Sequence, residues 1–249
     1  MSTKLYDQYY RACVQQLDAV MAKELGNIEK GAAWIADAVK KDQLVHVYGT
    51  GGHNSMTAGE MFTRAGALCN YNIWMPGGTP CFEAHPSTDN LPGMAKKVFD
   101  YYRPKSGEVL VLINVNGINA TTIESAMEAK ARGVKTIGIS SRQFSEAVEP
   151  DALQRHPSKK NACDLVDLHI DTYTPVGDMV LSLDKIGRKT GASSTFPLTL
   201  IVNLLNARAV EMLVEQGITP DFLMSVNTKA GAEWSMKMRD KWVGRIKHM

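Results

Sequence analysis

The run Leu44-Val45-His46-Val47-Tyr48-Gly49-Thr50-Gly51-Gly52 decides the fold of this chain. Its first five residues are mostly β-branched, apolar or aromatic, which predicts a short buried strand, and the glycines that follow predict a tight turn. The segment from Ser55 to Ala67 then has the pattern of a helix. A buried strand that leads through a glycine turn into a helix is the repeating unit of a parallel α/β sheet.

The alternation of strands and helices continues along the chain. Further strands are predicted at 69–75, 109–113, 134–139 and 165–170, and further helices at 91–102, 120–132 and 194–215. Because several of these strands are apolar on both faces, the sheet must be covered by helices on both sides. We therefore predict a three-layer, doubly wound α/β sandwich around a mainly parallel five-stranded sheet.

Two amphipathic helices, at 6–24 and 28–39, precede the first strand and predict an N-terminal helical hairpin. The 249 residues form one domain, with the hairpin at 1–42, the α/β core at 43–217 and a C-terminal tail at 218–249. Long irregular zones are expected at 75–90, 140–164 and 171–193. Loops of this length in a compact domain are more often functional than idle.

The composition argues against several classes of function. The 28 Lys and Arg residues nearly balance the 26 Asp and Glu residues, so no basic surface for nucleic acid is expected. The N-terminus lacks the apolar core of a signal peptide, and no membrane helix is expected, which makes the cytoplasm the default compartment. The cysteines are scattered without metal-ligand spacing and are interpreted as reduced thiols, with no metal and no cofactor implied: Cys13, Cys69, Cys81 and Cys163.

Polar residues gather in two turns that follow the first and third strands, and we expect both turns at the carboxyl edge of the sheet, where ligands bind. The candidate ligand-binding residues are Gly49, Thr50, Gly51, Gly52, Asn54 and Ser55 in the first turn, and Asn114, Asn116, Gly117, Asn119 and Thr121 in the second. Ser193 and Ser194 open the last long helix, where they either cap it or add ligand donors. A dinucleotide site is not indicated, because the first turn reads GTGGHN rather than GxGxxG and no acidic residue ends the second strand.

Four segments carry a resemblance to a known family: LVHVYGTGGHNSMTAGEMFTRAG (44–66), EVLVLINVNGINATTIESAMEAKARGVKTIGISS (108–141), DTYTPVGDMVLSLDKIGRKTGASST (171–195) and PDFLMSVNTKAGAE (220–233). In order and spacing the chain resembles sugar isomerase (SIS) domain proteins, most of all an uncharacterised single-domain SIS family of about this length. The resemblance covers nearly the whole chain. It implies a flavodoxin-like sheet and a homodimer or higher homo-oligomer.

SIS domains typically bind a phosphosugar with serine and threonine side chains and backbone amides, and the richest contribution comes from a loop of the form SxSGxT. In this chain both serines are replaced, by Asn114 and Asn116, while Gly117 is kept. Asparagine is bulkier than serine and fills space that a phosphate would occupy. The ligand implied by the resemblance is thus a sugar phosphate, a free sugar or a sugar acid.

Three residues are candidates for acid–base chemistry. The resemblance places Glu60 where several SIS isomerases carry a catalytic glutamate, although a surface carboxylate on an amphipathic helix is an equal alternative. His53 lies within the glycine turn and His85 lies in the loop 75–90; each can titrate near neutral pH or can be an ordinary loop histidine. Asp178 follows the fifth strand, either as a turn residue or as part of the same cleft.

We expect this chain to be a cofactor-independent isomerase (or a related lyase) acting on a sugar or sugar phosphate, because isomerisation needs only a base and a second group that handles the oxygen. The alternative is a non-catalytic regulatory module that binds a carbohydrate or a sugar phosphate. No DNA-binding domain is visible in the sequence, which lowers the odds of the alternative.

Overall fold

The computed structural model describes residues 4–76 and 88–249. Its central sheet has five parallel strands in the order β2-β1-β3-β4-β5. The strands are β1 Val45–Gly49, β2 Tyr71–Ile73, β3 Val109–Ile113, β4 Lys135–Ser140 and β5 Leu168–Asp171. This is the flavodoxin-like order: β2 lies on one side of β1, and β3, β4 and β5 follow on the other side, so the order switches between β1 and β3. The predicted parallel α/β sandwich is confirmed.

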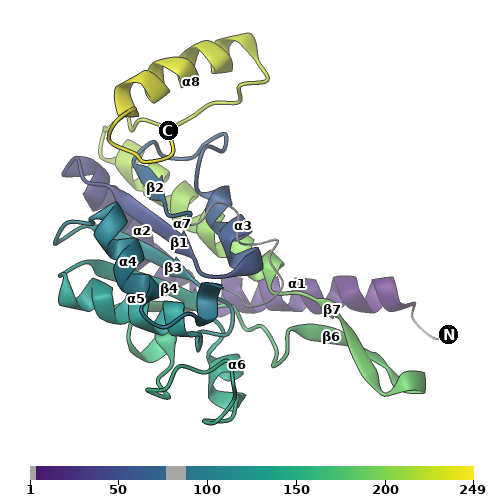
Figure 1. Cartoon of the computed structure of the whole chain (residues 1–249). Helices are drawn as coiled ribbons and strands as arrows, with labels where there is room; N and C mark the ends of the chain where they lie inside the picture. The colour runs from purple at the N-terminus through teal and green to yellow at the C-terminus, as the bar shows by residue number, and fades with distance from the viewer. Residues whose placement is uncertain (1–3, 77–87) are drawn as a thin grey trace.

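Helices cover both faces of this sheet (Figure 1). In β3, Val109, Val111 and Ile113 face the layer built by α2 (Leu25–Lys40), α3 (Gly52–Glu60) and α7 (Thr195–Glu215). Leu110 and Leu112 face the opposite layer, built by α4 (Met94–Tyr102) and α5 (Ala120–Ala131). All five residues of β3 are buried, which explains why this strand is an unbroken apolar run in the sequence.

The helix ends differ from the sequence prediction in several places. The break between the first two helices falls at Glu24, because α1 spans Leu5–Lys23 and α2 begins at Leu25. Helix α3 begins three residues earlier than expected, at Gly52, and ends at Glu60 rather than at Ala67. A short helix, α6 (Arg142–Ala147), and 3-10 turns at Thr88–Asn90 and Ala162–Asp164 lie inside zones that were expected to be irregular.

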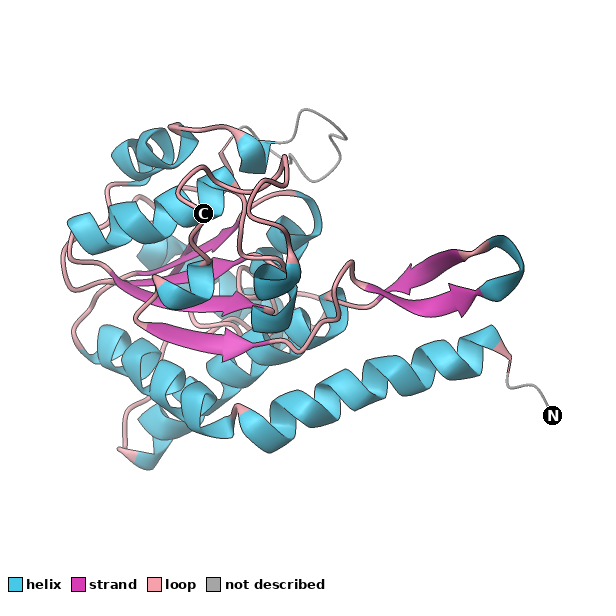
Figure 2. Ribbon diagram, turned by 90° about the horizontal axis from the view of Figure 1, so that it is seen from below, coloured by secondary structure: helices cyan, strands magenta, loops and turns pink. Residues whose placement is uncertain are grey.

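An antiparallel hairpin is the largest feature absent from the sequence prediction. Strands β6 (Met179–Leu183) and β7 (Arg188–Ala192) pair within the zone 171–193 and are joined by the 3-10 turn Asp184–Ile186. Figure 2 shows this hairpin and α1 projecting from the body side by side. A Cβ built on Gly191 would lie 3.0 Å from Cδ2 of Tyr9, so the hairpin packs closely on α1.

The C-terminal tail contains a helix, α8 (Lys229–Trp242), which the sequence analysis did not predict. Buried Met238 and Trp242 pack with Cys69 and Leu223 in a small separate core beside β2. By length and composition α7 is the one helix in residues 4–76 and 88–249 that could cross a membrane. Here it is a core helix, since one face from Leu198 to Leu213 is buried against α2 and α3.

Candidate functional site

The glycine turn after β1 is built by very close backbone contact. A Cβ built on Gly49 would lie 2.0 Å from the backbone oxygen of Asn54, so the strand end and the first turn of α3 touch directly. Gly51 precedes α3 with a φ of 76°, in the left-handed region that favours glycine. The Ser55 hydroxyl donates to the backbone oxygens of Gly49 (2.9 Å) and Gly51 (3.0 Å) and closes the turn.

The two predicted turns lie together at the carboxyl edge of the sheet, joined by a buried polar cluster. The Thr50 hydroxyl lies 2.6 Å from the Thr122 hydroxyl. Asn114 Nδ2 donates to the Thr50 hydroxyl (3.0 Å) and to its backbone oxygen (3.1 Å). Asn54 Nδ2 donates to the same backbone oxygen at 2.7 Å, and Asn54 Oδ1 accepts from the backbone N–H of Val115 at 3.2 Å. We name this assembly of the two turns the cradle.

The asparagines of the second turn bind the backbone of that turn. Asn114 Oδ1 accepts the N–H of Gly117 at 2.8 Å, and Asn116 Oδ1 accepts the N–H of Ile118 at 3.1 Å. In a phosphate-binding loop, backbone N–H groups such as these would point at the ligand. In this chain they already have acceptors within the protein.

His53, in the first turn of α3, belongs to a hydrogen-bonded chain that reaches α1. Its Nε2 lies 3.3 Å from the Ser194 hydroxyl, and that hydroxyl donates to Asp178 Oδ2 at 2.8 Å. Asp178 Oδ1 accepts the backbone N–H groups of Ser193 (2.9 Å) and Ser194 (2.7 Å). The Ser193 hydroxyl in turn accepts from Gln16 Nε2 of α1 at 2.8 Å.

This chain of hydrogen bonds fixes the proton on His53. The Ser194 hydroxyl has one proton and donates it to the Asp178 carboxylate, so it offers only lone pairs to His53. Nε2 of His53 must therefore carry the hydrogen, which leaves the Nδ1 lone pair as a base. Burial lowers the pKa of His53, and the carboxylates of Asp178 and Asp89 partly oppose this shift. The imidazole is thus neutral at pH 7.

Two acceptor oxygens at the cradle have no hydrogen-bond partner within the described part of the chain. One is Oδ1 of Asn119, a residue that is 3% exposed and stands at the N-cap of α5. The other is Oδ1 of Asp89, whose carboxylate rests on Gly51: a Cβ built there would lie 2.5 Å from Asp89 Oδ2. A buried acceptor without a donor costs free energy, so both oxygens are candidates for ligand contact.

The structure separates Glu60 from the cradle. Glu60 follows Gly52 by eight positions in α3, a rise of about 12 Å. Glu60 pairs with Arg64 at 3.2 Å and lines a different hollow, of about 410 Å³, with Asn203, Asn227 and Arg239. Its catalytic role stays a prediction. His85, the third candidate, lies outside the described residues.

The remaining ligand-binding candidates divide by exposure. Thr121 is 1% exposed at the start of α5, and Ser193 and Ser194 are buried around Asp178. Gly52 and Asn116 are half-buried at the rim of the cradle, and Gly117 adopts a φ of 62° beside Ser140. The deep part of the cradle is therefore structural, and its rim is the part that a ligand can meet.

Sequence reasoning missed Asp89 and gave Asp178 no definite role. The amino-acid sequence around Asp89 has no periodicity, so no pattern marked this residue. The signal for Asp178 was the preceding Gly177, since a carboxylate after glycine is often a turn residue, and in the structure Asp178 adopts a φ of 66°. What the sequence did not give was the partner, because Ser193 and Ser194 approach Asp178 only once the hairpin has formed.

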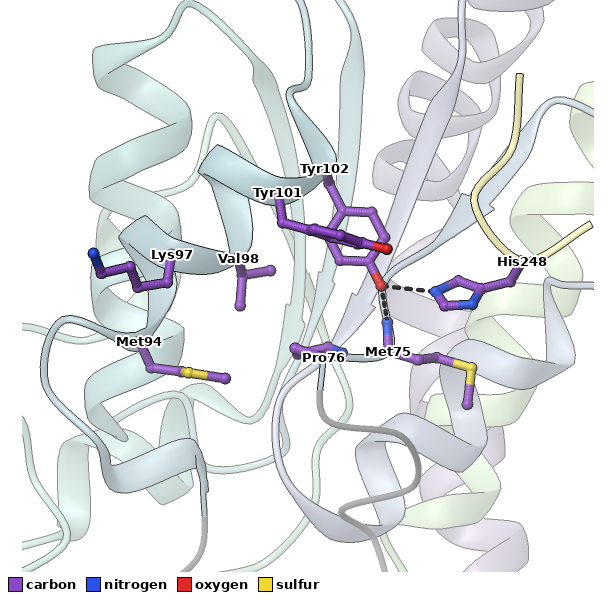
Figure 3. Close-up of a pocket in the computed structure, with 8 residues that line it drawn as sticks. All are labelled: Met75, Pro76, Met94, Lys97, Val98, Tyr101, Tyr102 and His248. Carbon is purple, nitrogen blue, oxygen red and sulfur yellow. Dashed lines mark hydrogen bonds between the residues drawn. The ribbon is translucent and has the colours of Figure 1, made fainter. Parts of the chain in front are cut away.

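A second hollow lies beside the end of β2, with a volume of about 280 Å³ (Figure 3). Tyr102 Oη accepts from the backbone N–H of Met75 (2.6 Å) and lies 2.8 Å from Nε2 of His248. The other walls of this hollow are largely apolar and include Met94, Val98 and Pro76. This lining suits an apolar group better than a sugar, so the cradle is the stronger candidate site.

Comparison with known proteins agrees with this architecture. A family model described as SIS domain matches residues 8–141. The chain belongs to the SIS domain family. Among its relatives is a UPF0309 protein of Streptomyces avermitilis, which is 30% identical over 249 residues, covering 98% of this chain and 97% of that protein. The resemblance to an SIS family of about 250 residues is confirmed.

Solved SIS structures share the fold at low identity. The sugar isomerase domain of an RpiR transcription factor from Sphaerobacter thermophilus is 14% identical, with a TM-score of 0.53, over 98% of this chain and 100% of that one. Phosphoheptose isomerase from Neisseria gonorrhoeae is also 14% identical, with a TM-score of 0.54, over 81% of this chain and 95% of that one. At this identity the likeness establishes the fold alone.

Proposed function

We propose that this protein binds a sugar or sugar derivative in the cradle and isomerises it without a cofactor, with His53 as the base. The observation that carries the proposal is the hydrogen-bonded chain from Asp178 through Ser194, which holds His53 neutral with Nδ1 unprotonated. A phosphoheptose isomerase with the same fold supports the reaction class. Aldose–ketose isomerisation needs a base that removes a proton from the carbon beside the carbonyl and returns it to the neighbouring carbon.

The chemistry follows from the protonation pattern. Nδ1 of His53 takes the proton from the carbon next to the carbonyl, which leaves an enediolate. The hydroxyl proton then moves from one oxygen of the enediolate to the other. The resulting imidazolium is stabilised by Asp178 through Ser194 and by the nearby carboxylate of Asp89. Returning the proton to the other carbon completes the exchange of aldose and ketose. Glu60, which the resemblance favours as the base, is the alternative to His53, and its catalytic role stays a prediction.

The test is exchange of substrate carbon-bound hydrogen with deuterium from heavy water, followed by NMR across a panel of aldoses, ketoses and their phosphates. His53→Gln keeps a donor near the Nε2 position but removes the base, so we expect exchange to slow at least about 100-fold. His248→Gln, on a histidine that contacts Tyr102 and not the cradle groups named above, should exchange at the wild-type rate. Loss of exchange in Glu60→Gln with a fully active His53→Gln would show that Glu60 is the base.

The pH dependence of kcat/KM has a definite sign. Since the base form of His53 is required and its pKa lies below the ordinary 6.5, activity should be flat at neutral pH and fall as pH drops through the lowered pKa. The pKa of His53 is lower in the folded protein than in the unfolded chain. Acid therefore places a charge on a buried imidazole, which also lowers the free energy of unfolding. An activity that instead rises toward acid pH would contradict His53 as the base.

A non-catalytic regulatory module is the second candidate. It is favoured by the place of Glu60, which pairs with Arg64 at a different hollow, so the carboxylate that the resemblance implies as the base does not line the cradle. The RpiR transcription factor domain shows that this fold occurs in regulators. Sugars that raise the melting temperature but show no hydrogen exchange would favour this candidate over the isomerase.

A further inference from the structure

A hollow of about 250 Å³ lies at the amino edge of the central sheet, the edge opposite the cradle. Leu44 and Glu108, which line it, immediately precede β1 and β3, whereas the cradle follows the ends of these two strands. The C-terminal residues form another of its walls. Four basic side chains line this space, and we name it the basic hollow: Arg103, Lys105, Arg245 and Lys247.

The floor of the basic hollow is a buried polar cluster. His46 is 1% exposed, and its Nδ1 lies 3.1 Å from Nε1 of Trp74, which can only donate. Nδ1 is therefore an acceptor, so Nε2 carries the hydrogen and donates it to Glu108 Oε2 at 2.8 Å. Glu108 Oε2 also accepts the backbone N–H of Lys105 at 2.7 Å. Burial alone would raise the pKa of Glu108, but these hydrogen bonds lower it, so the floor holds a neutral imidazole and an ionised carboxylate that already has donors.

Positive charge exceeds negative charge around this hollow. Its four basic side chains face two carboxylates, those of Asp42 and Glu108, which leaves a net charge of +2. Asp42 Oδ1 is paired with Nη1 of Arg245 at 2.8 Å. Within the part of the chain that the structure describes, the other three basic side chains form no ion pair. Because a hollow lined by charges of one sign concentrates ions of the opposite sign, the basic hollow should attract an anion.

Contacts within the protein account for only part of this basic cluster. Lys247 Nζ lies 4.8 Å from the ring centroid of Tyr101, and Arg103 Nε donates to the backbone oxygen of Asp100 at a long 3.4 Å. Among residues 4–76 and 88–249, nothing contacts the ammonium group of Lys105. A single exposed lysine would simply be solvated. Here the positive charges come from separate segments of the chain and border one hollow, as in a site for an anion.

The segments that carry these side chains are held in place by contacts that leave the charges free. The backbone N–H of Lys105 binds Glu108, and the backbone N–H of Lys247 donates to Asn72 Oδ1 at 3.3 Å. Ile246, which is 3% exposed, fixes the C-terminal segment in the small core beside β2. The ammonium groups can therefore bind a ligand without a change in the backbone around them.

We propose that the basic hollow binds a phosphate group, either as the free ion or as the ester of a small metabolite. At neutral pH a phosphate monoester carries about −1.5 to −2 charges, which complements the net charge of +2. Its oxygens accept the charge-assisted hydrogen bonds that ammonium and guanidinium groups donate. The bound phosphate joins the C-terminal segment to the segment between α4 and β3. This site lies at the opposite edge of the sheet from the cradle and does not depend on the proposed function.

Titration calorimetry at constant ionic strength tests the proposal, with inorganic phosphate and glucose 6-phosphate as probes. Lys105→Gln with Lys247→Gln removes two charges and keeps both backbone contacts. We expect this double variant to bind at least about tenfold more weakly than the wild type, because it loses two charge-assisted hydrogen bonds. Tighter binding of the ester than of inorganic phosphate would identify an ester as the ligand, and the reverse would identify the free ion.

The matched control is Lys229→Gln with Lys237→Gln, which removes the same charge from exposed positions on α8. This control should bind phosphate as the wild type does. Equal weakening in the control would show attraction by net charge alone and would contradict a site in the basic hollow. Circular dichroism establishes that each variant is folded, and Lys105→Gln alone provides a milder second variant.

Nitrogen-15 NMR of the histidine rings locates the bound phosphate. His46 lies in the floor of the basic hollow and His53 lies in the cradle. We expect inorganic phosphate to shift the His46 signals in the wild type, and to shift them less in the Lys105 and Lys247 double variant. A shift confined to His53 would place the phosphate in the cradle and overturn the proposal. A wild type that binds neither probe would overturn it as well.

Discussion

At the scale of the residue, one carboxylate sets the protonation of the candidate base. Asp178 accepts from the Ser194 hydroxyl, and this forces the hydrogen of His53 onto Nε2. In Asp178→Asn the new amide would donate to Ser194, the hydroxyl would turn toward His53, and Nε2 would become the acceptor. Nδ1 would then carry the hydrogen and could not act as a base. We expect kcat to fall about 100-fold to 10,000-fold, the range of a lost general base.

The nitrogen-15 NMR spectrum of His53 reports which ring nitrogen carries the hydrogen. This signal would not change if Asp178 only stabilised the fold. The wild type should show hydrogen on Nε2 and Asp178→Asn should show it on Nδ1. Asp184→Asn, at the exposed turn of the hairpin, is the matched control and should leave both the spectrum and kcat unchanged. An unchanged tautomer in Asp178→Asn would contradict the proposed chain.

Most residues of the cradle could be predicted from the sequence, but the hydrogen-bond partners of their side chains could not. Position after β1 and β3 was enough to select Thr50, Asn54, Asn114 and Asn116, because parallel strands deliver their turns to one edge. Whether an asparagine points at a ligand or binds its own turn depends on rotamers and partners, which no spacing encodes. Asp89 could not be found, since the amino-acid sequence around it has no periodicity.

At the scale of the element, the turn between β1 and α3 requires the glycine at position 49, whereas helix α3 does not require the one at position 59. Gly49→Ala would place a methyl group 2.0 Å from the backbone oxygen of Asn54, so the strand and helix must separate. We expect a loss of about 3 kcal/mol or more, because backbone cannot yield as a side chain can. Gly59, in the same helix, has nothing within 4 Å of its built Cβ, and Gly59→Ala should gain about 0.5–1 kcal/mol.

Urea unfolding of both variants measures the contrast. Equal effects of the two substitutions would show that the close approach at Gly49 is not needed for stability. Sugar binding should also differ between the two variants. Gly49→Ala distorts the turn that forms part of the cradle and should abolish binding, whereas Gly59→Ala should leave it unchanged.

The strands that could be predicted best from the sequence are those that are buried on both of their faces. Strands β1 and β3 were placed within a residue of their observed ends, because every residue in them is buried and most are apolar. The hairpin at 179–192 was missed because it lies outside the sandwich and is largely exposed, so its pattern is weak. Helix α8 was missed for a similar reason, since it buries only a few residues against a small separate core.

At the scale of the whole molecule, the arm formed by α1 and the β6–β7 hairpin projects from a body that is otherwise closed (Figure 2). A two-stranded hairpin is marginally stable alone in water, and this one packs mainly on α1. The arm also exposes large apolar side chains: Tyr6 is 66% exposed and Tyr10 is 69% exposed, four residues apart on one face of α1, and Ile186 at the hairpin tip is 66% exposed.

Such a surface is expected to be covered by a second copy, in line with the homodimer that the SIS resemblance implies. Sedimentation velocity should therefore give about twice the 27.3 kDa of the chain. Tyr6→Glu with Tyr10→Glu places two charges in the contact and should shift the protein toward monomer, since an unpaired buried charge is costly. Leu153→Glu with Val214→Glu changes two exposed apolar residues outside α1 and the hairpin and should leave the mass unchanged. A monomeric wild type, or a dimer that survives the tyrosine substitutions and dissociates in the control, would show that the arm is not the contact.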